Sequence, residues 1–197
     1  MPDLKGTRTA ENLMKAFAGE SQARNRYTYA ARTAQKEGFE HIAGIFLETA
    51  DNERVHAKLF LSKLIEHGMS GEGIEITAAY PVFWNMESTV KNLEYAVTGE
   101  NEEWSYLYPL FADIAEEEGF KDVAVLFRMV AKVEVKHEAR YKKLLHNVLN
   151  HEVFKKDGKV YWRCRECGYI HEGTEAPMTC PVCAHPQAFY EMFVENY

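Results

Sequence analysis

Two Glu-x-x-His motifs are the residues of this chain with the clearest chemistry. They are Glu53–His56 and Glu134–His137, and they stand 81 residues apart. A glutamate and a histidine at this spacing lie on one side of a helix, one turn from each other. A Gly-Glu pair precedes each motif: Gly19-Glu20 comes before the first and Gly99-Glu100 before the second. Two such motifs and one glutamate from each of two more helices form the ligand set of a di-metal site in a four-helix bundle.

Four long helices are expected to position these side chains. Gly38-Phe39, the Gly- and Pro-containing segment 68–85, and Gly119-Phe120 interrupt the helical pattern. The expected helices therefore span 8–37, 40–67, 86–118 and 120–149. Their connections are short, long and short, and the long crossover joins helices two and three. This mainly α arrangement is the connectivity of a ferritin-like bundle.

The two halves of the helical region form an internal repeat. Glu37-Gly38-Phe39 recurs as Glu118-Gly119-Phe120 with an offset of 81, whereas Glu20 and Glu100 are offset by 80. One additional residue must therefore lie in the third helix between Glu100 and Glu118. Pro109 falls in that window and has no N–H for the helix. We expect a π-bulge or kink near Leu107–Phe111.

Each expected helix carries a glutamate within its inward-facing apolar stripe. A single such residue would usually belong to a solvated face, but four positions in phase with two histidines favour a buried cluster. Converging buried carboxylates repel one another unless cations neutralise them. Glu103 adds a further carboxylate one turn after Glu100, where the first half has Ala23. Carboxylate and imidazole ligands suit iron or manganese.

All four cysteines occur in two knuckles, Cys164-x-x-Cys167 and Cys180-x-x-Cys183, separated by twelve residues. This spacing predicts a tetrahedral four-thiolate site, which would hold iron as a one-electron carrier or zinc as a structural ion. A redox site here also favours iron in the bundle. We expect a polar turn at 155–159 and β-type runs at 160–163 and 188–193, and we divide the chain into domains 1–150 and 151–197.

Composition excludes several partners. The net charge is −7 with no basic patch, so nucleic acid and anionic membrane surfaces are not expected partners. No apolar run is long enough to span a bilayer, and the first residues lack a secretory signal pattern. Clustered cysteines favour a metal site over disulfides and therefore a cytoplasmic location. Glu116-Glu117-Glu118 is expected to be a solvated face.

The chain resembles the rubrerythrin family over essentially its whole length. The matching stretches are AFAGESQARNRY, ETADNERVHAK, TGENEEW, YPLFADIAEEEGF, VEVKHE and WRCRECGYIHEGTEAPMTCPVCAHP. The resemblance implies two non-haem irons in the bundle, oxo- or hydroxo-bridged when oxidised, and one iron in a rubredoxin-like four-cysteine domain. It implies that Glu53 and Glu134 bridge the irons, that Glu20 and Glu103 bind one, and that Glu100 and His137 bind the other.

The resemblance also implies an activity. His56 would replace Glu103 on reduction, and Tyr27 and Tyr108 match tyrosines that hydrogen-bond near the site. Such proteins reduce hydrogen peroxide to water in oxidative-stress defence, with electrons from a nicotinamide-linked reductase or a rubredoxin, and they form homodimers. Two alternatives remain. One is a ferroxidase or iron-handling protein, and the other is a non-catalytic zinc-ribbon interaction protein.

Overall fold

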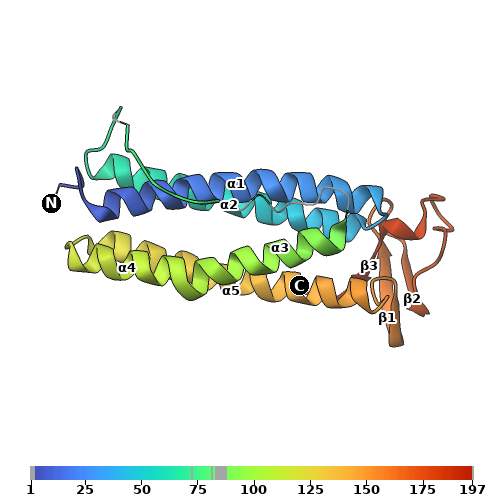
Figure 1. The fold of residues 1–197 in the computed structure, drawn as a ribbon. Helices are drawn as coiled ribbons and strands as arrows, with labels where there is room; N and C mark the ends of the chain where they lie inside the picture. Colours follow the sequence, from blue (N-terminus) through green and yellow to red (C-terminus); the bar gives the residue numbers. More distant parts are fainter. Residues whose placement is uncertain (1–2, 72, 81, 83–87, 197) are drawn as a thin grey trace.

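A computed structural model describes residues 3–71, 73–80, 82 and 88–196, and Figure 1 shows a long helical bundle with a small sheet at one end. The helices are α1 (Arg8–Lys36), α2 (Glu40–Glu66), α3 (Thr89–Glu102), α4 (Tyr108–Glu117) and α5 (Lys121–Leu149). A π-helical turn, Glu103–Leu107, joins α3 to α4. Together these three segments form the expected third helix, whose proposed first residues, 86 and 87, lie outside the described part of the chain.

The π-turn confirms the kind of distortion that the repeat predicts but not its position. It occupies Glu103–Leu107, whereas the expected range was Leu107–Phe111. The displacement has a simple cause, because a proline ring clashes with the carbonyl group four residues before it. Pro109 therefore disturbs the turn that precedes it and then begins α4, where a missing N–H costs nothing.

Each helical hairpin turns at a Glu-Gly-Phe sequence. Gly38 and Gly119 have φ values of 82° and 89°, which favour glycine. The N–H of Phe39 donates to the carbonyl of Ala34, and that of Phe120 donates to Ala115. These are the hydrogen bonds of a Schellman motif. In Figure 1 α2 ends and α3 begins at opposite ends of the bundle, and residues 73–80 run back along the bundle from the end of α2.

The glutamates of those two turns also join the ends of different helices. Glu118 accepts hydrogen bonds from the backbone N–H of Arg8 at 3.2 Å and of Thr9 at 2.9 Å, at the start of α1. Glu37 accepts from the N–H of Thr89, at 2.9 Å, at the start of α3. Free N–H groups at a helix start attract negative charge. The expectation of a solvated face at 116–118 is therefore wrong for Glu118, which is partly buried and caps α1.

The bundle core has two apolar clusters with a polar layer between them. One cluster is centred on Leu13, Phe60 and Phe127, and the other on Phe46, Tyr141 and Leu144. The four glutamates of the apolar stripes lie between these clusters along the helices, and all are buried. The sequence pattern thus places a charged layer inside an otherwise apolar bundle. Within the described residues, no helix is both long and apolar enough to cross a membrane.

The C-terminal part is a three-stranded antiparallel sheet in the order β2-β1-β3. Its strands are β1 (Lys155–Cys164), β2 (Ile170–Glu175) and β3 (Tyr190–Phe193). The expected polar turn at 155–159 is wrong, because these residues belong to β1, whose pairing with β2 shifts register between Lys155 and Val160. β2 was not expected, since its sequence shows little apolar alternation. The run at 188–193 divides into the end of a 3-10 turn and β3.

The sheet is attached to the bundle beside the α1–α2 turn. Phe154 stacks on Phe39 with ring centroids 6.2 Å apart. A guanidinium nitrogen of Arg165 lies 2.7 Å from where a Cβ of residue 44 would stand, so this contact requires Gly44 in α2. Buried Glu191 of β3 accepts hydrogen bonds from both Arg163 and Arg165. These contacts hold the first cysteine knuckle against α2.

Candidate metal centres

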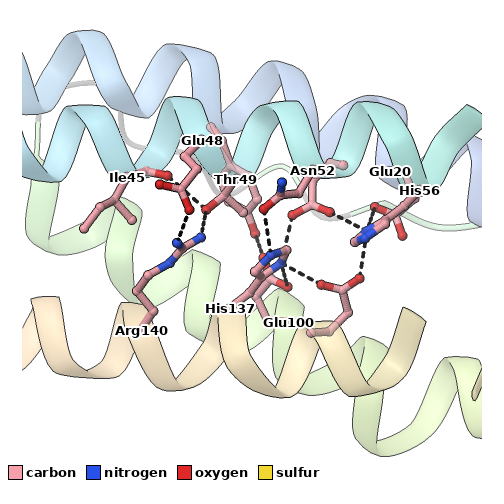
Figure 2. A network of polar contacts seen from close by, with 12 residues as sticks. Glu20, Ile45, Glu48, Thr49, Asn52, His56, Glu100, His137 and Arg140 are labelled. Atoms are coloured by element: carbon pink, nitrogen blue, oxygen red, sulfur yellow. Dashed lines mark hydrogen bonds and ion pairs between the residues drawn. The ribbon is translucent and has the colours of Figure 1, made fainter. Parts of the chain in front are cut away.

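Six side chains from four helical segments meet in the polar layer of the bundle, and all of them are buried. They form two groups whose ligand atoms lie within 4.8 Å of one another: Glu20, Glu53, His56 and Glu134, and Glu53, Glu100, Glu134 and His137. Figure 2 shows the two imidazoles on opposing helices, each turned toward carboxylates. The structure therefore brings together six of the seven side chains that the sequence indicated for this layer.

The two groups share their central carboxylates. Nδ1 of His56 lies 2.9 Å from Glu53 and 3.0 Å from Glu134. Nδ1 of His137 lies 3.2 Å and 2.7 Å from the other oxygens of the same two residues. Glu20 is 3.8 Å from His56, and Glu100 is 3.4 Å from His137. Glu53 and Glu134 can thus each offer one oxygen to either side, as bridging carboxylates do.

The chemistry of this cluster fits a pair of cations. Eight of its oxygen and nitrogen atoms are buried without a well-formed hydrogen bond. Burial raises the pKa of Glu20 to about 8, and burial beside Glu53 raises the pKa of Glu100 well above its usual range. Burial alone would lower the pKa of His137, but the surrounding carboxylates raise it to about 12. The raised pKa values mean that the cluster holds protons, which partly neutralise its carboxylates. Metal ions would supply this positive charge in their place.

Glu103 differs from the other six candidates. Among the described residues it joins neither group, and its half-buried carboxylate lines a cavity beside Tyr27 and Tyr108. Both tyrosines are buried. Tyr27 donates a hydrogen bond to Glu100, and Tyr108 donates one to Glu20. The structure therefore has His56, and not Glu103, beside Glu20.

Several polar neighbours of the cluster were not anticipated. Asn52 places its carbonyl oxygen 3.3 Å from Nε2 of His137, which can orient the ring so that Nδ1 faces the carboxylates. Buried Glu138 accepts hydrogen bonds from Asn101 at 2.9 Å and Trp104 at 3.2 Å, which tie α5 to the third helix. Asn52 and Glu138 are adjacent in sequence to Glu53 and His137. That adjacency is the signal that could have identified them.

The four cysteines form a second candidate centre. All four are free thiols, and their sulfurs lie within 4.8 Å of one another. Cys164 and Cys183 are 3.7 Å apart, and Cys167 and Cys180 are 3.6 Å apart. A tetrahedral ion with metal–sulfur bonds of about 2.3 Å separates its ligands by roughly 3.8 Å. The sulfurs are therefore placed for one tetrahedral ion.

The two knuckles have the same backbone pattern. The N–H of Gly168 donates to the carbonyl of Cys164, and that of Ala184 donates to Cys180, both at 2.9 Å. Gly168 has a φ of 79° and Ala184 a φ of 59°, so both residues are left-handed. This conformation suits glycine and strains alanine. Gly168 and Ala184 thus form equivalent turns, and the turn at Ala184 carries the greater backbone strain.

The comparisons with known proteins agree with this architecture. A family model described as rubrerythrin matches residues 11–145, and one described as the rubredoxin-like domain of rubrerythrin matches residues 162–191. The chain is 57% identical to rubrerythrin-1 of Clostridium acetobutylicum and 56% identical to the rubrerythrin of Clostridium perfringens, and each match covers all of both chains.

Solved structures show the same relationship at the level of the fold. A mixed-valence nigerythrin is 30% identical, with a TM-score of 0.62 over 98% of this chain and 92% of its own. An open-pore ferritin from Archaeoglobus fulgidus has a TM-score of 0.61 over 74% of this chain and 87% of its own; at 14% identity it shows the fold alone.

The fold and the two centres define a ferritin-like di-iron protein of the oxidoreductase type, with a rubredoxin-like domain. The chain belongs to the rubrerythrin family. Its cofactors are those of that family, iron in the carboxylate and histidine cluster of the bundle and iron in the four-cysteine cluster.

Proposed function

We propose that this protein is a peroxidase that reduces hydrogen peroxide to water with electrons delivered through its four-cysteine iron. The observation that carries the proposal is the pair of ligand groups sharing Glu53 and Glu134, in a chain that also carries a four-thiolate site. A pair of ferrous ions held by these residues would supply two electrons for cleavage of an O–O bond without release of a hydroxyl radical.

We assign the ligands from the two groups. Glu53 and Glu134 would bridge the two irons, Glu100 and His137 would bind one of them, and Glu20 with either His56 or Glu103 would bind the other. Support for an exchange between the last two residues comes from their positions. His56 lies with Glu20 in the cluster, while the Glu103 carboxylate lies in the adjoining cavity.

The two tyrosines position the outer carboxylates and hold protons beside the site. Burial raises the pKa of both Tyr27 and Tyr108 well above the usual range, so each phenol remains protonated and keeps its hydrogen bond. Tyr27 thereby orients Glu100, and Tyr108 orients Glu20. Reduction of peroxide to water consumes two protons as well as two electrons, and these phenols are the proton-bearing groups nearest the carboxylates.

The electron donor we propose is a nicotinamide-linked reductase or a rubredoxin that contacts the four-cysteine domain. Cys167 is exposed, which gives such a donor a short path to the iron. We also propose a homodimer in which the four-cysteine domain of one copy serves the di-iron site of the other. Within one chain, the apolar cluster around Tyr141 and Leu144 lies between the site and the end that carries the sheet.

Two further proposals concern the domain division and the cellular location. We retain the division into a bundle domain, 1–150, and a four-cysteine domain, 151–197. We also propose a cytoplasmic location, because four free thiols arranged for one metal ion suit a reducing compartment.

The deciding experiment is an anaerobic titration of the dithionite-reduced protein with hydrogen peroxide, followed by visible absorption. Rapid return of the thiolate–iron and diferric bands, at one peroxide per two electrons, is the expected result. If the bands return slowly with air and do not return with peroxide, the protein is a ferroxidase and not a peroxidase. A colourless protein would indicate zinc and remove the electron-transfer argument.

A further inference from the structure

A cavity of about 340 Å³ lies between α1 and the third helix, on the side where the crossover passes. Residues 77–80 form one wall, and the hydroxyl of Tyr80 donates to the backbone carbonyl of Lys15 at 3.0 Å. This hydrogen bond anchors the crossover over the groove. A Cβ on Gly19 would lie 3.9 Å from the Tyr80 ring, so the wall stands close to α1 without filling the space.

The cavity reaches the di-iron layer. Tyr27, Glu103 and Tyr108 line it, and the two tyrosines are the residues that hydrogen-bond to Glu100 and Glu20. A molecule in the cavity therefore lies against the polar groups of the site.

The remaining walls combine apolar and polar side chains. Ala16, Ala23, Leu107, Leu110 and Phe111 form the apolar part, while Lys15, Arg26 and Glu102 are charged and Tyr95 and Tyr106 are aromatic with a hydroxyl group. Hydrogen peroxide gains nothing from these apolar contacts, because both of its oxygens carry O–H groups that require hydrogen-bond partners. An apolar wall next to a redox site matches a substrate with one oxidised end and one hydrocarbon end.

The volume exceeds what hydrogen peroxide requires. A water molecule occupies roughly 30 Å³ in the liquid, and a dry apolar cavity of roughly 150 Å³ is enough to hold benzene. A space of about 340 Å³ therefore accommodates an aromatic ring together with a peroxide group.

We propose that this cavity admits apolar organic hydroperoxides and that the site reduces them to the corresponding alcohol. The inference rests on the proposed peroxidase function and extends its substrate class. The reaction is ROOH + 2 e⁻ + 2 H⁺ → ROH + H₂O. The O–O bond breaks, and one new O–H bond forms on each product. Both electrons come from the donor that reduces the protein, which is dithionite in the test below.

The test compares peroxides in single turnovers. Reduced full-length protein, freed of excess dithionite, is mixed anaerobically with hydrogen peroxide or with cumene hydroperoxide, and the return of the visible bands is timed. Leu110→Trp places a large side chain at the cavity wall. Leu59→Trp is the matched control, because Leu59 lies on α2 away from the cavity and is 41% exposed, against 39% for Leu110.

We expect both peroxides to reoxidise the unaltered protein. Leu110→Trp should slow the reaction with cumene hydroperoxide by about tenfold or more and change that with hydrogen peroxide by less than about twofold, while Leu59→Trp leaves both unchanged. Binding gives a readout without turnover. Cumyl alcohol, the product, should shift the methyl resonances of Leu107 and Leu110 saturably in the oxidised protein.

Two results would overturn the inference while leaving the proposed function in place. In the first, hydrogen peroxide reoxidises the reduced protein but cumene hydroperoxide does not. In the second, Leu110→Trp changes the reoxidation rate equally with both peroxides. Failure of hydrogen peroxide itself would remove the proposed function, and this inference with it.

Discussion

At the scale of single residues, the exchange that we propose between His56 and Glu103 starts from unequal positions. His56 lies 3.8 Å from Glu20, whereas Glu103 lines the cavity together with Tyr108 and belongs to neither ligand group among the described residues. Glu103 begins the π-turn, where the backbone departs from regular helix geometry.

Replacement of this carboxylate tests the exchange. Glu103→Ala should retain iron, because six other ligands remain, and should slow peroxide turnover by about 10- to 100-fold. Iron content and steady-state peroxidase rate are the measurements. Glu117→Ala, at an exposed glutamate of α4 that does not line the cavity, is the control and should behave like the unaltered protein. An unchanged rate in Glu103→Ala would end the idea that Glu103 serves as a ligand in turnover.

A second residue-scale prediction concerns the knuckle turns. Ala184→Gly relieves a left-handed alanine and should stabilise the four-cysteine domain by about 0.5–1 kcal/mol after the greater flexibility of unfolded glycine is subtracted. Gly168→Ala, at the equivalent turn of the other knuckle, should destabilise it by about 1 kcal/mol, because no neighbour blocks the added methyl group but the φ does. The midpoint of thermal bleaching of the thiolate–iron bands reports both changes. Equal midpoints in the two variants would contradict this account.

At the scale of elements, the internal repeat explains contacts between helices that are distant in sequence. Glu37 and Glu118 occupy matching turns, and each carboxylate reaches the start of another helix. The two caps are unequal. Glu118 accepts hydrogen bonds from two backbone N–H groups and from the hydroxyl of Thr9, whereas Glu37 accepts a backbone hydrogen bond from Thr89. The repeat therefore fixes where the caps lie, and local packing sets their strength.

Glu118→Gln should lower the free energy of unfolding by about 1–2 kcal/mol at pH 7, since a charge-assisted helix cap is lost. Glu37→Gln, the matched variant, should cost less than about 1 kcal/mol. Denaturant unfolding followed by helical circular dichroism measures both. A larger loss for Glu37→Gln than for Glu118→Gln would refute the ranking.

The Glu118 cap also has a defined pH dependence. Burial alone would raise the pKa of Glu118, but hydrogen bonds from Thr9 and Arg8 outweigh it and hold the pKa below the usual 4.5. The folded protein therefore binds fewer protons here than the unfolded chain. The stabilisation is present above pH 4.5 and is lost as the pH falls through the folded value. The difference between the unaltered protein and Glu118→Gln should shrink accordingly.

At the scale of the whole molecule, one ion-pair cluster of the C-terminal part lies where the sheet meets the bundle. Glu191 lies between Arg163 and Arg165, and His41 of α2 stands 3.8 Å from the same carboxylate. Both arginines flank Cys164, so this cluster sets how the four-cysteine centre sits on α2. Its strength comes from charge-assisted hydrogen bonds to one buried carboxylate.

Glu191→Gln should lower the free energy of unfolding of the four-cysteine domain by about 2 kcal/mol, because the hydrogen bonds from Arg163 and Arg165 would then have a neutral acceptor instead of a charged one. Calorimetry should show the four-cysteine part melting at a lower temperature with little change in the bundle. Glu195→Gln, an exposed glutamate just beyond β3, is the control and should leave both transitions in place. A common downward shift of both transitions in Glu191→Gln would mean that the cluster stabilises the whole chain instead.

The path of electrons is the second whole-molecule question. If the four-cysteine centre of one copy serves the di-iron site of another, variants that each lack one centre should complement. Cys167→Ser and Glu134→Ala should be inactive alone, and their co-expressed mixed dimers should recover peroxidase activity. Mixed dimers without activity would place the electron path within a single chain.

The sequence by itself determined the four helices, the chemistry of the polar layer and the four-thiolate site. These follow from short-range rules: the helical period puts Glu20, Glu53, Glu100 and Glu134 on inward faces, and the Cys-x-x-Cys spacing suits one metal ion. The repeat offset also required an extra residue in the third helix. Only its position, before Pro109 instead of around it, differed in the structure.

Only the tertiary structure decided which groups meet across the bundle. It placed His56 rather than Glu103 beside Glu20, made Glu118 a cap for α1, and paired β2 with β1 despite its weak pattern. It also left a cavity with a partly apolar wall beside the site. Each of these depends on contacts between residues far apart in the chain, and periodicity within one element carries no information about them.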